Sequence, residues 1–359
     1  MDEQAGHRFE DIAIPQVHAR SHTPARVSVD LPARLRLMTS SAFVFPGQGS
    51  QSVGMGQALA AASPAAAAVL ATADAALGES ISQLAATGPA DRLDRTENAQ
   101  PALLAVSIAY LAAVRERWGA LGIEAPVPAF AAGHSMGQYS AFVAAGVISI
   151  EDGVRLVRAR GRLMQSSGAG RDGAMAAILG LDDAAVPALV ERASAHGVFG
   201  VANRNAPGQV VVSGERAAIE ASADIARELG ARKAIVLPVS VAAHSPLMAE
   251  AADGMRRVLA DVPFRDPSIT LLSNSGAEPI TTAAAARTEL VAHLTAGVDW
   301  VAAVERMTAA GVTTFIEVGP GRVLTGLIKR IALDAEVLAL DDPASPDRLA
   351  VPFATATTA

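Results

Sequence analysis

The sequence lacks cysteine altogether, and this absence removes whole classes of chemistry. Its 359 residues provide no disulfide, no thiolate ligand for a metal and no cysteine nucleophile. A signal peptide is also missing, as is an apolar run of about 18 residues or more. We therefore expect a cytoplasmic protein that does not insert into a membrane.

An excess of positive charge is missing too. The chain has 29 Lys and Arg against 36 Asp and Glu, and the net charge of −7 argues against nucleic acid or an anionic membrane as the main partner. Only 18% of the residues are charged, whereas 51% are hydrophobic, which is ample for the core of one large domain or two unequal ones. We expect the chain to be a monomer.

The most informative stretch that is present covers residues 130–141, where an apolar run breaks into Gly-His-Ser-Met-Gly and then into helix-forming residues. A strand that turns sharply into a helix leaves the central serine, Ser135, at the tip of the turn. The same turn puts the amide of Met136 at a helix N-terminus, where it favours a developing oxyanion. Ser135 is the candidate nucleophile, although a serine that only caps a helix fits the same pattern.

Strands and helices alternate in the first half of the chain. An apolar strand at 42–45 runs into the glycine-rich loop 46–51, alanine-rich segments at 56–77 and 100–117 have helical spacing, and a strand at 126–132 precedes the serine turn. This order predicts the α/β class, with a hydrolase-like, mostly parallel sheet and helices on both faces. No Gly-Lys-Ser/Thr follows the loop, so we interpret it as a backbone loop that lines a pocket.

A different pattern follows, with short strands and helices in βαββαβ order, which is typical of a ferredoxin-like subdomain. We expect this small subdomain, residues 171–238, to be inserted into a large catalytic domain formed by 41–170 and 239–340. The ends, 1–40 and 341–359, have no periodic apolar positions and are expected to be a flexible extension and a flexible tail. A cleft between the domains would be a common place for a ligand.

Arg160 stands out in the helix that follows Ser149. At 100° per residue, one side of this helix is apolar and consists of Leu156, Val157, Leu163 and Met164. The other side is basic and consists of Arg155, Arg158 and Arg162. Arg160 falls in the middle of the apolar side, and a buried guanidinium needs an anionic partner. Either a protein carboxylate or a ligand carboxylate fits, and the pattern leaves both open.

A serine nucleophile needs a base, and histidine is the usual one near neutral pH. Four histidines lie outside residues 1–40, and the side chain of His134 should point away because it directly precedes the serine. His196 fits a solvated helix end, and His293 fits a surface position. His244, where the chain returns from the small subdomain, is the predicted base, with a hydrogen-bonded interior histidine as the alternative.

Together these segments resemble the malonyl-CoA:acyl carrier protein transacylase family, the acyltransferases of fatty-acid and polyketide synthesis. The resemblance runs from Phe43 to about Ile331. Its motifs are, in chain order, Phe-Val-Phe-Pro-Gly-Gln-Gly-Ser-Gln at 43–51, Gly-His-Ser-Met-Gly at 133–137, Val-Arg-Leu-Val-Arg-Ala-Arg-Gly at 154–161, Asn203, Asn205, Pro-Gly-Gln at 207–209, Val-Ser-Val-Ala-Ala-His at 239–244 and Glu-Val-Gly-Pro-Gly at 317–321.

The resemblance implies a role for each matching residue. Ser135 would carry the acyl ester and His244 would be its base. The backbone amides of Gln48 and Met136 would form the oxyanion hole. Arg160 would bind the free carboxylate of a malonyl-type acyl group.

The resemblance also implies that a backbone carbonyl, rather than an acid, orients the catalytic imidazole, and this carbonyl would belong to His293. Two positions depart from the family pattern. The family commonly has Glu where Gln138 stands and often Gln where His293 stands, so a charge is lost beside the serine turn and a second imidazole is gained near the site. That imidazole could affect the pH dependence. Met136 and the string 241–244 look closer to the stand-alone fatty-acid enzymes, which favours malonyl.

The implied reaction is a ping-pong transfer from malonyl-CoA to the phosphopantetheine thiol of an acyl carrier protein, with no metal or organic cofactor. Alternatives are a trans-acting polyketide acyltransferase for another acyl unit, an acyl-thioester hydrolase of the same fold, an α/β-hydrolase esterase and a carrier-binding scaffold without chemistry. Arg160 argues against the hydrolases. Retention of Ser135 and His244 beside it argues against the scaffold.

Overall fold

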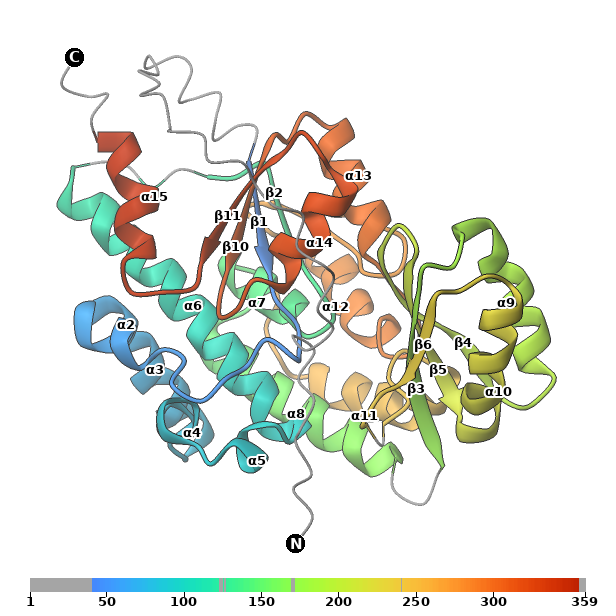
Figure 1. Cartoon of the computed structure of the whole chain (residues 1–359). Coiled ribbons are helices and arrows are strands. Elements are labelled where there is room, and N and C mark those ends of the chain that lie inside the picture. The colour runs from blue at the N-terminus through green and yellow to red at the C-terminus, as the bar shows by residue number, and fades with distance from the viewer. Residues whose placement is uncertain (1–40, 123–124, 126, 169–171, 240, 355–359) are drawn as a thin grey trace, which may run out of the picture.

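The computed structural model describes residues 41–354, except 123–124, 126, 169–171 and 240. Residues 1–40, expected to be a flexible extension, lie outside the described residues. The described chain forms two sheets, and helices surround the larger one on both faces (Figure 1).

The larger sheet has the strand order β11-β10-β1-β2-β7-β8. From β11 to β7, each pair of neighbouring strands is parallel. The edge strand β8 pairs antiparallel with β7. This confirms the predicted mostly parallel sheet. The strands are Ser41–Phe45 (β1), Phe130–Gly133 (β2), Thr270–Leu272 (β7), Pro279–Ile280 (β8), Thr314–Val318 (β10) and Glu336–Leu340 (β11).

Strand β1 is buried along its whole length, because helices cover both of its faces. Phe43 and Phe45 belong to one hydrophobic cluster, whereas Ala42 and Val44 belong to a second. Alternate side chains of a strand point to opposite faces, so each cluster fills one side of the sheet. Helices α6, α7, α8, α11 and α12 contribute to the first cluster, and helices α13 and α14 contribute to the second.

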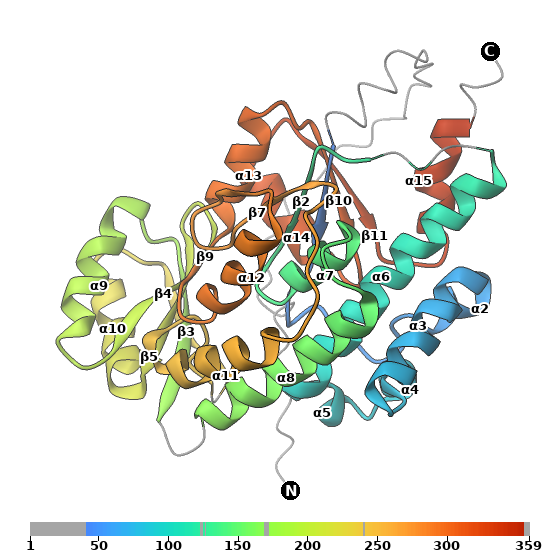
Figure 2. The same cartoon turned by 180° about the vertical axis from the view of Figure 1, so that it is seen from behind.

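The helices around this sheet include the long α6, which packs against α3 and α8. Figure 2 shows α8 and α11 side by side on the far side of the molecule. In the described part of the chain, no helix is long and apolar enough to cross a membrane. The helices are Gln57–Ala62 (α2), Pro64–Leu77 (α3), Ile81–Thr87 (α4), Ala90–Leu93 (α5), Thr96–Ala120 (α6), Gly137–Ala144 (α7), Ile150–Gly168 (α8), Ala249–Leu259 (α11), Ala283–Ala292 (α12), Trp300–Ala309 (α13), Val323–Ile331 (α14) and Ser345–Ala354 (α15), with a 3-10 turn at Pro246–Met248 (η3).

The smaller sheet has the strand order β6-β3-β5-β4-β9. Its first four strands pair antiparallel, and β9 joins β4 in parallel from a later part of the chain. One hydrophobic cluster lies between this sheet and helices α9 and α10. The elements are Gly173–Leu179 (β3), Asp183–Ala185 (η2), Val186–Ser194 (α9), Phe199–Ala206 (β4), Gln209–Glu215 (β5), Arg216–Glu228 (α10), Lys233–Val236 (β6) and Val298–Asp299 (β9).

The C-terminal segment differs from the expectation of a flexible tail over 341–359. Helix α15 forms there and packs against α6, where Asp347 pairs with Arg117 and Leu349 is buried. The composition of this segment is a poor guide, because a short helix is stabilised by packing rather than by its own propensity. Residues 355–359 lie outside the described residues.

The turn from β2 into α7 is packed so closely that its glycines are required. A Cβ atom on Gly133 would lie 2.0 Å from the backbone carbon of Gly137, and one on Gly137 would lie 2.2 Å from the carbonyl oxygen of Phe45. Strand β1 thus presses directly against the start of α7. Two residues of the serine motif are fixed by backbone contact alone.

We expect Gly137→Ala to lower the free energy of unfolding by about 2 kcal/mol or more, because the methyl group would push α7 away from β1. Urea denaturation of the purified variant measures the change. Gly119→Ala is the matched control, since Gly119 is exposed near the end of α6 with open space around it. That substitution should leave stability unchanged or raise it by about 0.5–1 kcal/mol. Equal midpoints for the two variants would contradict the packing argument.

Candidate active site

Ser135 occupies the tip of the turn between β2 and α7. Its φ angle is 52°, in the left-handed region that residues other than glycine rarely adopt. The side chain of Asn274 holds this backbone in place, because its Oδ1 accepts from the amide of Ser135 at 2.8 Å. The strained turn is the geometry expected of a nucleophile.

His244 lies directly against the serine. Its Nε2 is 2.8 Å from Oγ of Ser135, and its Nδ1 lies 2.7 Å from the carbonyl oxygen of His293 and 3.1 Å from that of Ala296. A carbonyl oxygen can only accept, so Nδ1 must carry the proton and Nε2 is free to accept from the serine hydroxyl. The imidazole therefore has the tautomer that a general base needs, and backbone carbonyls rather than a carboxylate select it.

Arg160 reaches the same serine from α8, and only 1% of its surface is exposed. One terminal nitrogen donates to Oγ of Ser135 at 3.0 Å, and the other donates to Oε1 of Gln100 at 2.8 Å. Both acceptors are neutral, and within the described residues no carboxylate pairs with this guanidinium. Of the two partners that the sequence left open, a protein carboxylate is therefore not found in this part of the chain.

Met136 directly follows the serine in the chain, and Gln48 lines the same cleft as Ser135. Met136 is the residue before α7 and has helical angles, so its amide lies at the N-terminus of that helix, where amides have no intrahelical acceptor. Gln48 belongs to the loop after β1, and its side chain donates to Oγ1 of Thr96. Neither amide has an acceptor among the residues that the structure describes. Both are thus free for an oxygen of a ligand.

These groups open into a cleft of about 810 Å³ between the two sheets. The larger sheet and its helices contribute Gln48, Ser135 and Arg160 to the wall. The smaller sheet contributes polar and apolar side chains from the ends and faces of its strands, namely Met175, Leu179, Asn203, Asn205, Gln209 and Val211. The site therefore depends on residues from both halves of the fold.

His134 differs from the expectation that its side chain points away. The ring lines the cleft, with Nε2 2.9 Å from Oδ1 of Asn205 and the ring centroid 5.8 Å from that of Trp300. The left-handed backbone at Ser135 is the reason, because the alternation of an extended chain stops there and neighbouring side chains can face the same space.

The other two histidines, His196 and His293, differ in burial. His196 is exposed, which confirms its expected solvated position after α9. The prediction of a surface position for His293 is wrong, because this residue is fully buried beside Tyr139 and its ring centroid lies 6.2 Å from that of His244. Burial, the charge of Arg160 and the neighbouring imidazole all lower the pKa of His293 well below its usual value.

Arg158 belongs to the basic side of α8, but this part of that side is not solvated. Arg158 is 5% exposed and pairs with Glu79, while also donating to the carbonyl oxygen of Glu97 and to the side chain of Asn98. The periodicity of one helix cannot show this, because the start of α6 and the loop before α4 cover that side.

Sequence reasoning missed the polar network behind the serine. Asn274 donates through Nδ2 to the carbonyl oxygen of Gly133 and to Oε1 of Gln138, at 2.9 and 3.0 Å, and its own amide donates to Oε1 of Glu289. Gln138 in turn donates to the carbonyl oxygen of Leu272, which an ionised glutamate could not do. The amide at Gln138 therefore completes this network, and the buried carboxylate nearby is that of Glu289.

Gln100 was also given no role, although it accepts from Arg160 and is completely buried. Its signal in the sequence is weak, because a glutamine directly before Pro101 indicates only a break between two helical segments. Only the approach of α6 to α8 makes it a partner of the guanidinium.

The electrostatics of the site favour a neutral imidazole. Burial, and secondly the charge of Arg160, lower the pKa of His244 to about 3. The residue is consequently deprotonated at neutral pH and able to take a proton from Ser135.

Comparison with known proteins shows that this chain is similar to acyltransferases. Residues 42–340 match the family described as acyl transferase domain. The malonyl CoA-acyl carrier protein transacylase of Escherichia coli strain K12 is 44% identical over 308 residues, which are 86% of this chain and 98% of that protein. A crystal structure of an acyl carrier protein S-malonyltransferase from Vibrio cholerae is 42% identical with a TM-score of 0.81, over 86% of this chain and 99% of that one. A malonyl-transacylase in complex with a type II PKS acyl-carrier protein is 40% identical with a TM-score of 0.80, over 86% and 97% of the two chains.

The depressed pKa of His244 predicts how serine reactivity depends on pH. We expect the rate at which a fluorophosphonate probe labels Ser135 to stay level from pH 7.5 down to about 5, because His244 gains its proton only near pH 3. Arg160→Ala removes a positive charge that disfavours the imidazolium, so it should move the acid limb to higher pH. His293→Gln, which keeps the backbone carbonyl, is the control and should leave the limb in place. A wild-type limb near pH 6.5 would contradict the assignment.

Proposed function

Because this chain belongs to the acyl transferase domain family, we propose that it transfers a malonyl group from malonyl-CoA to the phosphopantetheine thiol of an acyl carrier protein, through an ester of Ser135. The observation that carries the proposal is that an imidazole and a guanidinium both contact the hydroxyl oxygen of Ser135. Oγ of Ser135 lies 2.8 Å from a neutral imidazole and 3.0 Å from a buried guanidinium that has no protein carboxylate among the described residues.

In the first step, Nε2 of His244 takes the hydroxyl proton while Oγ of Ser135 attacks the thioester carbonyl of malonyl-CoA. The negative charge that develops on the carbonyl oxygen is stabilised by the amides of Gln48 and Met136. The carbon–sulfur bond then breaks, and the leaving thiolate of CoA takes the proton from Nε2. The malonyl group remains on the serine as an ester.

The second step reverses these roles with another thiol. The phosphopantetheine thiol of the carrier protein gives its proton to Nε2 of His244, and its sulfur attacks the ester carbonyl. Oγ of Ser135 leaves and recovers the proton. Throughout both steps the carbonyl oxygens of His293 and Ala296 hold the Nδ1 proton, so the imidazole exchanges protons only through Nε2.

Arg160 supplies selectivity for a free carboxylate. A guanidinium can grip a carboxylate through two parallel hydrogen bonds, and the low polarity around a side chain that is 1% exposed strengthens the attraction. The donors of Arg160 contact the neutral groups of Ser135 and Gln100. A malonyl carboxylate would replace the serine as acceptor and leave Oγ to the imidazole.

The rival functions fit the site less well. An α/β-hydrolase esterase would need an acid on His244, whereas carbonyl oxygens accept from its Nδ1. A hydrolase of the same fold has no use for a buried cation facing the acyl group. A trans-acting polyketide enzyme for a related carboxyacyl unit would use the same contacts, and the relative that is titled as a complex with a type II PKS carrier protein keeps that pathway open beside fatty-acid synthesis.

The proposal includes the organisation expected from the sequence. Residues 41–170 and 239–340 would act as the catalytic domain, and 171–238 as a ferredoxin-like subdomain that narrows the cleft and holds the ester away from water. The order β6-β3-β5-β4 and the two helices on one face support this assignment. The enzyme would work as a cytoplasmic monomer without metal or cofactor, and with neither nucleic acid nor a membrane as partner.

Intact-protein mass spectrometry after brief incubation with malonyl-CoA, methylmalonyl-CoA or acetyl-CoA tests the proposal. We expect a malonyl adduct on the wild type, none on Ser135→Ala, and a shift of preference toward acetyl by at least tenfold for Arg160→Ala, because the charge that binds the carboxylate is gone. Addition of a holo carrier protein should remove the adduct faster than water does.

Arg162→Ala is the matched control for the guanidinium, because this neighbour on α8 is exposed and pairs with Glu97. Its adducts should match those of the wild type. No adduct from any donor, or acetyl loading preferred by the wild type, would move the assignment to another acyl donor, a hydrolase or a scaffold.

A further inference from the structure

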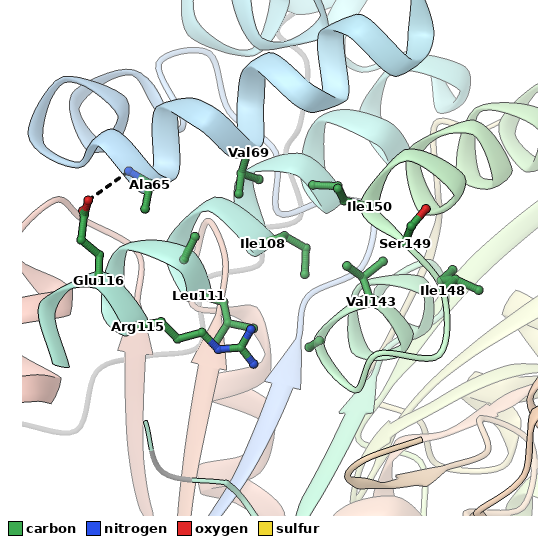
Figure 3. Close-up of a pocket in the computed structure, with 12 residues that line it drawn as sticks. Ala65, Val69, Ile108, Leu111, Arg115, Glu116, Val143, Ile148, Ser149 and Ile150 are labelled. Carbon is green, nitrogen blue, oxygen red and sulfur yellow. Dashed lines mark hydrogen bonds between the residues drawn. The ribbon is translucent and has the colours of Figure 1, made fainter. Parts of the chain in front are cut away.

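A second cavity, of about 490 Å³, lies away from the catalytic cleft, between α3, α6 and the turn that joins α7 to α8 (Figure 3). None of its lining residues takes part in the site around Ser135. Its walls are mainly aliphatic, with contributions from Ala65, Val69, Ile108, Leu111, Ala112, Val143, Ala144, Ile148 and Ile150. Arg115, Glu116 and Ser149 are its polar members.

The polar members of this cavity are not equivalent. Glu116 caps the start of α3, because its carboxylate accepts from the hydroxyl of Ser63 and from the amide of Ala65. Ser149 is engaged with Asp152 at the start of α8. Figure 3 shows Glu116 at one end, turned toward Ala65, while Arg115 extends beneath the aliphatic side chains.

Arg115 is the member that is left without a partner. Within the described residues no carboxylate or carbonyl oxygen accepts from its guanidinium, whereas Arg117, two residues further along α6, pairs with Asp347. The Arg115 side chain is exposed to solvent, and partial desolvation by the surrounding aliphatic groups lowers its pKa. The cavity thus combines an apolar wall with a solvent-exposed positive charge that has no acid partner among the described residues.

We propose that this cavity binds an aliphatic carboxylate, with the hydrocarbon chain against Val69, Ile108 and Leu111 and the head group on Arg115. A planar guanidinium suits a carboxylate because it can donate two parallel hydrogen bonds. The volume falls within the range of roughly 300–1,000 Å³ that small ligands occupy. An unpaired cation beside an apolar wall also disfavours neutral alkanes and cationic amphiphiles.

A ligand in this cavity would contact helices that also carry residues of the catalytic site. Helices α6, α7 and α8 line it, and their other parts carry Gln100, the amide of Met136 and Arg160. The inference does not rest on the proposed acyl transfer, because it concerns binding of a ligand at residues that the reaction does not use.

Isothermal titration calorimetry of the full chain with octanoate tests the proposal, with hexanoate, octanol and octyltrimethylammonium as comparison ligands. We expect saturable binding of one octanoate, weaker binding of hexanoate, and at least tenfold weaker binding of octanol and of the cation. Arg115→Gln should weaken octanoate binding at least tenfold. Arg117→Gln, on the same helix, is the matched control and should bind like the wild type.

Two further variants separate this cavity from the catalytic cleft. Ala112→Leu adds bulk to a half-buried wall position and should weaken octanoate binding even though Arg115 remains. Arg160→Ala should leave binding unchanged. Loss of binding in Arg160→Ala with retention in Arg115→Gln would place the ligand in the catalytic cleft and overturn the proposal, as would equal affinity for octanoate and octyltrimethylammonium. Unfolding midpoints of all variants check that each one is folded.

Discussion

The contact between the end of β1 and the turn at Ser135 is the constraint on which the site depends. Gly133 and Gly137 leave no space for a Cβ atom, and the backbone of the serine is held in the left-handed region by Asn274. Because β1 and β2 are central and parallel, this contact also fixes the loop that follows β1. The backbone at Gln48 and at Met136 is consequently placed by packing.

Charge in the site is arranged by burial rather than by ion pairs. Arg160 is a buried cation whose hydrogen-bond acceptors are neutral, and together with burial it lowers the pKa of His244, so that this imidazole stays neutral. An acid beside the imidazole would partly cancel that cation. Backbone carbonyls fix the tautomer without adding negative charge, so the proposed serine and histidine pair is compatible with a proposed carboxylate-binding group beside it.

The catalytic cleft and the cavity around Arg115 differ in how their cations are surrounded. In the catalytic cleft, polar groups from both sheets converge on one oxygen, whereas in the cavity around Arg115 a cation faces an aliphatic wall. Each guanidinium lacks a protein carboxylate within the described residues, although neighbouring arginines such as Arg117 and Arg162 have one. Arg160 is buried and Arg115 is exposed, and the lack of an acid partner among the described residues is what the two proposals of a carboxylate ligand share.

The sequence by itself determined the parallel sheet, the serine turn and the choice of His244, because periodicity, glycine spacing and motif order are local properties of the chain. It also singled out Arg160, since a charge on an apolar helix face is visible without a structure. Only the tertiary structure decided that His134 faces the cleft, that His293 and Arg158 are buried, that α15 packs on α6, and that Asn274 supports a serine 139 residues away. These outcomes depend on which elements cover which side chain, and contacts between distant segments leave no periodic trace in the sequence.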